Sequence, residues 1–259
     1  MTNYDIDVRT DKMESGIVYA PFDQALDILQ RNSADLISTA QNAQLRMQQW
    51  ANSPVSQNGN RVREGVIYRP NENSRLVRVS PIIASAKDAT NAHRNRKEFY
   101  LTSLQIEQAL ADSIEFPVKN IKIPTKRFGE EALTTYVFGG EKQAQLYGAF
   151  LAEAGIKAMP VWAVDKNHVN KQSKPFARQL WFGRLGDYRS YLYGDDRYLY
   201  LGDYGVRGVR QLVSTEGANV AQKISRPESE LYTPSQITKA LEGMITGLEA
   251  QLMNKLRGK

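Results

Sequence analysis

The sequence has no cysteine, only two histidines and no long apolar run, and each shortage excludes a class of protein. Without cysteine there are no disulfides, thiolate nucleophiles, iron–sulfur clusters or cysteine-based zinc sites. A Ser-His-Asp triad would have to use His93 or His168, and a two-histidine metal site would need both. Nothing approaches the roughly 18 consecutive apolar residues of a membrane span, so we expect no membrane-spanning segment.

The composition is that of an ordinary globular protein. Of the 259 residues, 41% are apolar and 24% are charged, and this length can bury a sizeable core. The net charge of +6 is modest and spread out, so we expect no specific nucleic-acid binding. The first residues lack the basic start and apolar stretch of a secretory signal peptide. We therefore expect a protein of the cytoplasm or, if it acts outside the cell, of a virion such as a phage particle.

Residues 21–50 carry apolar or small residues at alternating steps of four and three, which predicts one long helix. Such a helix either lies on its own domain or pairs with copies of itself, which would make the protein a homo-oligomer. Residues 51–62 are polar, contain Pro and Gly, and are typical of a linker. We therefore assign residues 1–60 to an N-terminal helical segment for oligomerisation or attachment.

The remainder alternates between strand and helix patterns, which indicates an α+β fold. Residues 84–97 are polar and predict a loop. Strands are expected at 63–69 and 75–83, which flank PNENS as a hairpin, and at 159–164, 176–185, 198–201 and 206–213. Helices are expected at 102–114, where Thr102 and Gln105 form a capping-box pattern, at 129–137, at 140–154, which Gly155 ends, and from Thr233 onward. We take 61–220 as one ligand-binding domain and 221–259 as a C-terminal helix.

Motifs for catalysis are scarce. No P-loop, GxGxxG, HExxH or GxSxG pattern occurs. His168 lies in a polar stretch where Asp165 could orient it, which leaves an enzyme of unknown type as one alternative. Asp195, Asp196 and Asp203 lie close in sequence, but their spacing matches no calcium-binding loop. We expect no catalytic residue, no metal site and no cofactor.

Tyrosine is concentrated in one short segment. Residues 187–204 read DYRSYLYGDDRYLYLGDY, and six of the thirteen tyrosines fall within the seventeen positions 188–204. Tyrosine supplies a large amphipathic contact area with few rotatable bonds, and small polar residues supply adaptable hydrogen bonds, as in antibody paratopes. The simpler interpretation is a surface hairpin with leucines inward and tyrosines in water. Six water-facing tyrosines would form an unusually large aromatic patch, which favours a binding role.

The region around this segment ends in the run GVRGVR and contains a set of fixed-looking positions. These are Trp181, Leu185, Ser190, Leu192, Gly194, Arg197, Leu199, Gly205, Val206, Arg207, Gly208, Val209 and Arg210. With these residues the chain, over roughly residues 176–212, resembles the variable proteins of diversity-generating retroelements. In that family, adenine-directed mutagenesis scrambles codons such as AAC, which can yield Tyr, Asp, Ser, Gly, Arg or Leu. Here about fifty residues follow the segment, whereas the family's variable region usually lies near the C-terminus.

The resemblance implies a C-type-lectin-like fold with variable side chains on a rigid scaffold. Leu192, Leu199, Val206 and Val209 would then anchor the core, and Arg207 or Arg210 would hold the closing strand through buried hydrogen bonds. Turns would be permitted by Gly194, Gly202 and Gly205.

We therefore expect a non-enzymatic receptor-recognition protein that binds a protein or glycan ligand through residues 187–204. The expected binding residues are Asp187, Tyr188, Arg189, Tyr191, Tyr193, Asp195, Asp196, Tyr198, Tyr200, Asp203 and Tyr204. Besides the enzyme that uses His168 and Asp165, the second alternative is a structural virion protein with a fixed tyrosine-rich subunit interface.

Overall fold

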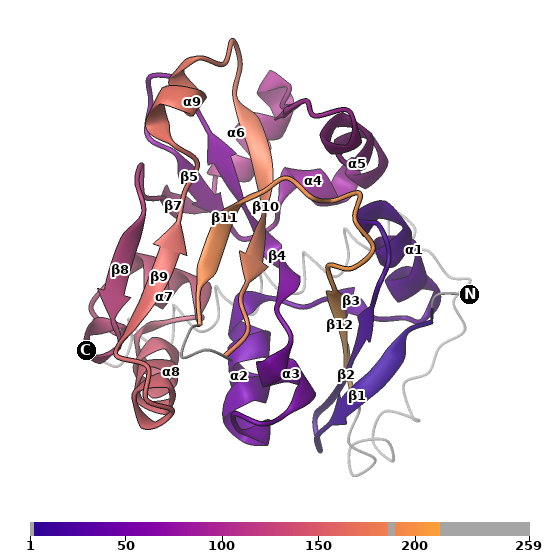
Figure 1. Cartoon of the computed structure of the whole chain (residues 1–259), viewed down its shortest axis with the longest axis vertical. Helices are drawn as coiled ribbons and strands as arrows, with labels where there is room; N and C mark the ends of the chain where they lie inside the picture. Colours follow the sequence, from indigo (N-terminus) through magenta and orange to yellow (C-terminus); the bar gives the residue numbers. More distant parts are fainter. Residues whose placement is uncertain (1–2, 186–189, 213–259) are drawn as a thin grey trace, which may run out of the picture. The chain divides into compact units, whose positions relative to one another are not determined.

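A twelve-stranded mixed sheet runs through the described part of the protein (Figure 1). The computed structural model describes residues 3–185 and 190–212. The main path of the sheet has the order β1-β2-β12-β4-β10-β11-β9-β8, with the other strands paired to its sides. The strands are β1 (Asp5–Arg9), β2 (Met13–Val18), β3 (Asp35–Leu36), β4 (Asn60–Tyr68), β5 (Arg75–Val77), β6 (Phe99–Tyr100), β7 (Ser113–Glu115), β8 (Ile121–Pro124), β9 (Ala158–Trp162), β10 (Phe176–Phe182), β11 (Leu192–Asp196) and β12 (Val206–Gln211).

The helices pack on this sheet in two groups, each with its own buried cluster. One cluster gathers side chains from α2, α7 and α8 with those of β9 and β10, and the other gathers side chains from α1 and α5 with those of β12. The helices are α1 (Phe22–Arg31), α2 (Thr39–Gln49), α3 (Pro54–Gln57), α4 (Pro81–Ala84), α5 (Ala86–Arg94), α6 (Ser103–Leu110), α7 (Ala132–Val137), α8 (Glu141–Glu153) and α9 (Lys166–Asn170), with a 3-10 turn at Thr125–Arg127. In Figure 1, α2 and α8 lie at the lower end of the sheet, and α1 and α5 lie at its right.

The last described strand, β12, lies beside the N-terminal hairpin of β1 and β2. β12 pairs antiparallel with β2 along its whole length, from Val206 opposite Val18 to Gln211 opposite Met13. β12 also meets β4, where Val206 lies opposite Arg61 in a parallel bridge. Because β4 also pairs with β10, it holds both ends of the segment between β10 and β12, which contains the tyrosines of interest.

The prediction of one helix over residues 21–50 is wrong. α1 ends at Arg31, Ser33 adopts a left-handed φ of 51°, and Asp35–Leu36 form strand β3 against β12. Ser38 then caps α2, because its hydroxyl accepts from Gln41 N–H while the Gln41 side chain accepts from Ser38 N–H. Local Asn-Ser and Ser-x-x-Gln signals therefore override an apolar periodicity that continues across the break.

The expected segment boundary at residue 60 is not a structural boundary. Residues Met1–Leu212 form one compact unit, and β1 and β2 belong to the same sheet as the later strands. The predicted linker at 51–62 contains α3 and the start of β4. The predicted helices from Thr233 onward, and the proposed segment 221–259, lie outside the described residues.

The other local predictions had mixed outcomes. The hairpin is confirmed in its first part, since Gly65 pairs with Val77 across β4 and β5, but the strand predicted at 75–83 ends at Val77 and Pro81–Ala84 form helix α4. Thr102 caps α6 with Gln105, and Gly155 follows α8 with a φ of 82°. The loop predicted at 84–97 is instead helix α5 over most of its length, and the strand predicted at 198–201 is a turn.

Candidate functional site

Three aromatic residues and one arginine lie in register across four neighbouring strands. Trp162 on β9 lies opposite Tyr193 on β11, Tyr193 opposite Trp181 on β10, and Trp181 opposite Arg61 on β4. Directly opposed residues on neighbouring strands share a face of the sheet. Side chains that are far apart in sequence are thereby brought into one row, and the Trp162 and Tyr193 rings meet edge to face at 5.7 Å.

Arg61 holds the segment 197–204 over this row. Its fully buried guanidinium donates from Nε to Asp196 Oδ2 at 2.8 Å, from NH2 to the Tyr198 carbonyl at 2.6 Å and from NH1 to the Tyr204 carbonyl at 3.1 Å. The other Asp196 oxygen accepts from Tyr198 N–H at 2.9 Å. Charge-assisted bonds of this kind are about twice as strong as neutral ones. The loop backbone is therefore pinned at both ends; Leu199 is buried in the core, while the tyrosine side chains of the loop stay at least partly exposed.

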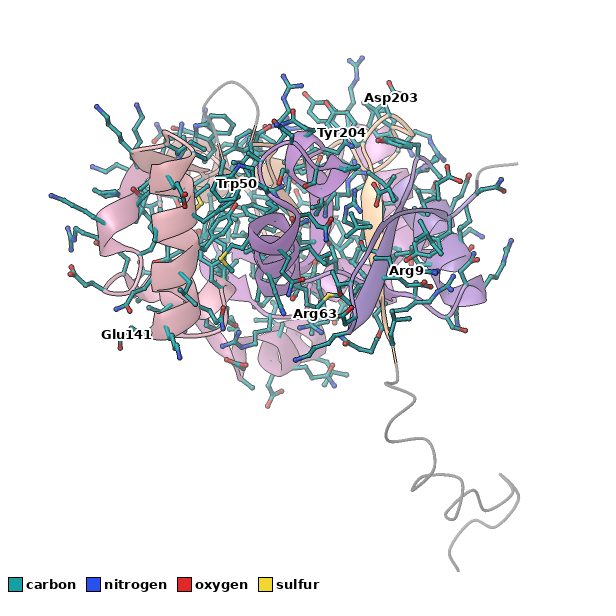
Figure 2. All side chains as sticks on the ribbon, turned by 90° about the horizontal axis from the view of Figure 1, so that it is seen from below. Arg9, Trp50, Arg63, Glu141, Asp203 and Tyr204 are labelled. Carbon is teal, nitrogen blue, oxygen red and sulfur yellow. The ribbon has the colours of Figure 1, made fainter. Side chains whose placement is uncertain are left out.

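These elements enclose a hollow of about 310 Å³. We call it the aromatic hollow. Its lining consists of Trp162, Trp181, Tyr191, Tyr193, Asp196, Tyr198 and Tyr204. Tyr198 and Tyr204 stack at 5.8 Å between ring centroids, and Trp162 meets Tyr191 at 4.6 Å. Figure 2 shows Tyr204 next to Asp203 at the rim of the molecule.

The structure brings most of the predicted binding residues to this face. Tyr191, Tyr193, Tyr198 and Tyr204 line the aromatic hollow, and Tyr200 lines a neighbouring pocket. Asp203 is exposed beside Tyr204, and Asp195 is partly buried between Arg178 and Arg197. Asp196 lines the hollow but is only 1% exposed, and both of its oxygens are used within the protein. Asp187, Tyr188 and Arg189 lie outside the described residues.

The residues expected to anchor the core do so. Leu192, Leu199 and Val206 are 0% exposed and Val209 is 3% exposed. The buried Arg207 donates from NH2 to Asp7 Oδ2 at 2.8 Å, and Arg210 donates to Glu14 at 2.7 Å, which ties β12 to the N-terminal hairpin. Gly194 lies within β11 rather than in a turn. A Cβ at this position would come within 2.9 Å of the Phe116 ring and the Tyr68 hydroxyl, so the close packing there needs glycine.

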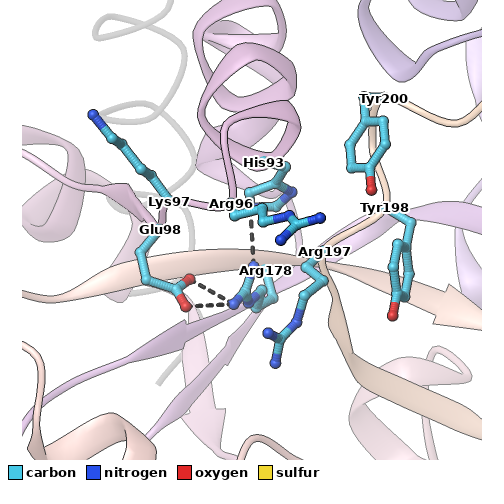
Figure 3. Close-up of a pocket in the computed structure, with 8 residues that line it drawn as sticks. All are labelled: His93, Arg96, Lys97, Glu98, Arg178, Arg197, Tyr198 and Tyr200. Carbon is cyan, nitrogen blue, oxygen red and sulfur yellow. Dashed lines mark hydrogen bonds and ion pairs between the residues drawn. The ribbon is translucent and has the colours of Figure 1, made fainter.

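A second hollow of about 330 Å³ adjoins the first and shares Tyr198 with it (Figure 3). We call it the basic pocket. It is lined by His93, Arg96, Lys97, Glu98, Arg178, Arg197, Tyr198 and Tyr200. Arg178 donates to Glu98 Oε1 at 2.6 Å and lies 3.1 Å from His93 Nε2. In Figure 3 the two tyrosines lie to one side, Lys97 and Glu98 to the other, and the three arginines and His93 between them.

Burial shifts the pKa values of titratable side chains at both sites. Desolvation, helped by the nearby Arg178 charge, lowers the pKa of His93 to about 3, so its imidazole is neutral at physiological pH. Desolvation, with the neighbouring Asp195 and Asp196 charges, raises the pKa of Tyr193 to about 12. Tyr193 therefore keeps its proton and can donate a hydrogen bond in the aromatic hollow. Desolvation also raises the pKa of Asp195 above its ordinary value.

The side chains of Asp165 and His168 do not form the expected pair. The Asp165 carboxylate accepts from the backbone N–H groups of Asn167 and His168 and thereby caps α9. The His168 imidazole instead lies 2.9 Å from Glu98. Among the residues the structure describes, no group of three or more His, Asp or Glu side chains is placed to hold a metal ion. None of the described helices has the length and apolar character needed to cross a membrane.

Sequence reasoning missed the residues that other strands contribute to the site. Trp162, Arg61 and Arg178 were not singled out as binding or positioning residues. A tryptophan in each of the strands predicted at 159–164 and 176–185 was a visible signal, but only the strand pairing places both rings beside Tyr193. The basic run RNRK at 94–97 was a second signal, in a segment predicted to be loop.

The comparisons with known proteins bear on the fold. A solved structure described as "Accommodation of massive sequence variation in Nanoarchaeota by the C-type lectin fold" matches with a TM-score of 0.55 and covers 80% of this chain and 100% of its own. This chain has a C-type lectin fold. The sequence identity is 17%, and neither a protein-family model nor a curated protein matches the sequence. The α+β lectin-like fold expected from the sequence is thus confirmed.

Proposed function

We propose that this protein is a non-enzymatic binding protein that recognises its ligand at the aromatic hollow. The observation that carries the proposal is the hollow itself. Six aromatic side chains from β9, β10, the β11 segment and the pinned loop surround a volume of about 310 Å³. Ligand sites typically have volumes of about 300–1,000 Å³, are lined mainly by aromatic and apolar groups, and contain few polar ones. The hollow lies at the small end of that range and contains one carboxylate.

Within residues 190–210, buried side chains hold the fold and exposed side chains face solvent, and this division supports a binding surface made of the exposed ones. Along β11, buried Leu192 and Gly194 alternate with partly exposed Tyr191, Tyr193 and Asp195. The buried residues and Arg61 maintain the backbone, and the outward side chains contribute little to it. Such a surface can change its side chains without loss of the fold.

This division also supports diversification of the outward positions by a retroelement. The structural neighbour is described as accommodating massive sequence variation on the same fold. We extend that description to this chain as a proposal, with receptor recognition on a cell surface as the role. A phage particle or the cytoplasm of the host would be the setting, and a homo-oligomer would strengthen weak sites through avidity.

The binding experiment uses an immobilised panel of glycans and cell-surface proteins. The wild-type chain is compared with Trp162→Ala and Tyr193→Ala, and with the control Trp50→Ala, an exposed tryptophan at the C-terminal end of α2 that does not line the hollow. Signals that are lost in both hollow variants and retained in the control support the proposal. Signals that survive both hollow variants would place binding elsewhere.

Three further measurements test the alternatives and the oligomeric state. Sequencing of this locus across its source population should show substitutions concentrated at the tyrosine and aspartate positions of 187–204; uniform drift would favour a fixed subunit interface in a virion. Light scattering reports the oligomeric state. For the enzyme alternative, His168→Ala should abolish turnover, whereas on our proposal it leaves ligand binding unchanged.

A further inference from the structure

The basic pocket has more positive than negative charge. Arg96, Lys97, Arg178 and Arg197 line it, against the carboxylate of Glu98. A second carboxylate, Asp195, lies 3.7 Å from Arg178 and 3.5 Å from Arg197. These two acids leave an excess of two positive charges. Within residues 3–185 and 190–212, no carboxylate pairs with Arg96 or Lys97.

A buried donor in the lining also has no partner. His93 is 2% exposed, and its Nε2 lies 3.1 Å from Arg178 NH1. Because the guanidinium can only donate, His93 Nε2 accepts, and the proton of the neutral imidazole is on Nδ1. Nδ1 has no hydrogen-bond partner among the described residues. A buried donor without an acceptor costs free energy, so the wall of the pocket at His93 holds an unmet hydrogen bond.

Arg96 occupies a position where glycine is usual. Lys97 N–H bonds to the Ala92 carbonyl and Arg96 N–H bonds to the His93 carbonyl, which is the Schellman arrangement that ends α5. Arg96 therefore has a left-handed φ of 57°. Most side chains are disfavoured there, whereas glycine is not. Arginine at this position therefore costs conformational free energy relative to glycine. Figure 3 shows its side chain beside His93.

We propose that the basic pocket binds an oxyanion, a carboxylate, sulfate or phosphate group, and so selects acidic ligands for the neighbouring aromatic hollow. Arg96 supplies guanidinium donors that no carboxylate of the described residues occupies, and Arg178 and Lys97 contribute positive charge, with the unpartnered His93 Nδ1 buried in the pocket wall. Guanidinium groups bind planar or tetrahedral oxyanions through paired N–H donors. Tyr198 lines both hollows, so a ligand seated on the aromatic rings would bring its acidic group to this pocket. The selection of ligands rests on the proposed function, whereas the anion site does not.

The test is a titration of the whole chain with sodium sulfate, sodium phosphate and sodium acetate, followed by NMR at ionic strength held constant with sodium chloride. We expect saturable shifts at His93 and at the arginine side chains of the pocket. Arg96→Gln should weaken binding roughly tenfold, the loss of about one charge-assisted hydrogen bond. Arg94→Gln is the matched control, because Arg94 lies on the same helix and its side chain bonds to Asn91.

A second variant separates binding from folding. Arg96→Gly relieves the left-handed strain, so its melting temperature should rise while its anion affinity falls. Absence of saturation with all three anions, or an equal loss in Arg94→Gln, would overturn the anion site. Tyr193→Ala should leave sulfate binding unchanged, so a failure of the aromatic hollow would not be mistaken for a failure of this pocket.

Discussion

The aromatic hollow and the basic pocket are neighbours of nearly equal volume, about 310 and 330 Å³, but they are built differently. The hollow takes its walls from sheet strands in register and from one pinned loop. The pocket takes its walls from the end of α5, the turn after it, a buried arginine on β10 and the other side of the same loop, which contributes Arg197 and Tyr200. Tyr198 is a wall of both.

The difference lies in what each site can change without loss of the fold. In the hollow, most tyrosine side chains face outward and the backbone is held by other residues, chiefly Arg61. In the pocket, His93 and Arg178 are themselves buried parts of the core. One surface can vary, whereas the inner part of the other is fixed, and a ligand that touches both would meet a variable and a constant region.

The largest expected effect comes from Arg61→Ala, which should damage both sites at once. It leaves Asp196 buried without its cation and releases the carbonyls of Tyr198 and Tyr204. Removing one partner of a buried ion pair lowers the free energy of unfolding by about 3–5 kcal/mol. Urea denaturation measures the loss, with Arg63→Ala, an exposed arginine on the same strand, as control. Equal effects of the two substitutions would show that Arg61 does not anchor the loop.

The next effect belongs to the basic pocket alone. Native His93 stays neutral down to its pKa of about 3, whereas the unfolded chain protonates it below about 6.5. The unfolded state therefore binds more protons, and this group makes stability fall as pH falls from 6.5 toward 3. At pH 4 the contribution is about 3 kcal/mol. Urea denaturation of wild type and His93→Gln at pH 8 and pH 4 measures it; equal losses in both proteins would contradict the assignment.

A smaller effect is expected from Gly194→Ala in the strand beneath the hollow. The added methyl group meets the Phe116 ring and the Tyr68 hydroxyl, and overpacking of this kind costs about 1–3 kcal/mol. Thermal unfolding measures the loss. Gly140→Ala offers a comparison in which nothing lies within 4 Å of the added methyl, although its φ of 123° adds backbone strain. If Gly194→Ala were neutral, the strand would be less tightly held than its contacts indicate.

The smallest effect on stability should come from Tyr198→Ser, at the wall that the two sites share. Its side chain is 37% exposed, and Arg61 holds the loop through the Tyr198 backbone, so we expect a loss below about 1 kcal/mol. The same variant should nevertheless weaken ligand binding on the panel. A large loss of stability would mean that the displayed side chains support the fold, which would argue against a variable surface.

Much of the fold could be predicted from local patterns in the sequence. Thr102 with Gln105 predicted the start of α6, and the α+β class and the inward residues Leu192 and Val206 were also predicted. These features depend on neighbours in sequence. The break at Ser33 could have been predicted as well, since Asn32-Ser33 and the Ser38 capping box both mark helix ends. Periodicity was given too much weight over those signals.

The candidate sites could be predicted only in part. The tyrosines that line the aromatic hollow were singled out, since their density is visible along the chain. Trp162 and Arg61 join them only through sheet register, and Arg178 meets His93 only after β10 and α5 are packed. Asp196 was predicted to contact ligand, and its bond to Arg61 could not be predicted without the pairing of distant strands.

The pairing of β12 with β2 has a consequence for how the protein folds. Arg207 and Asp7 are two hundred positions apart, so the closing contact must overcome the entropy of joining a very long loop. Contacts of such high sequence separation form slowly. The loop that carries Tyr198 and Tyr204 is held between β11 and this last strand. We therefore expect the binding face to be among the last parts of the protein to fold, so that a chain which displays it has already completed its sheet.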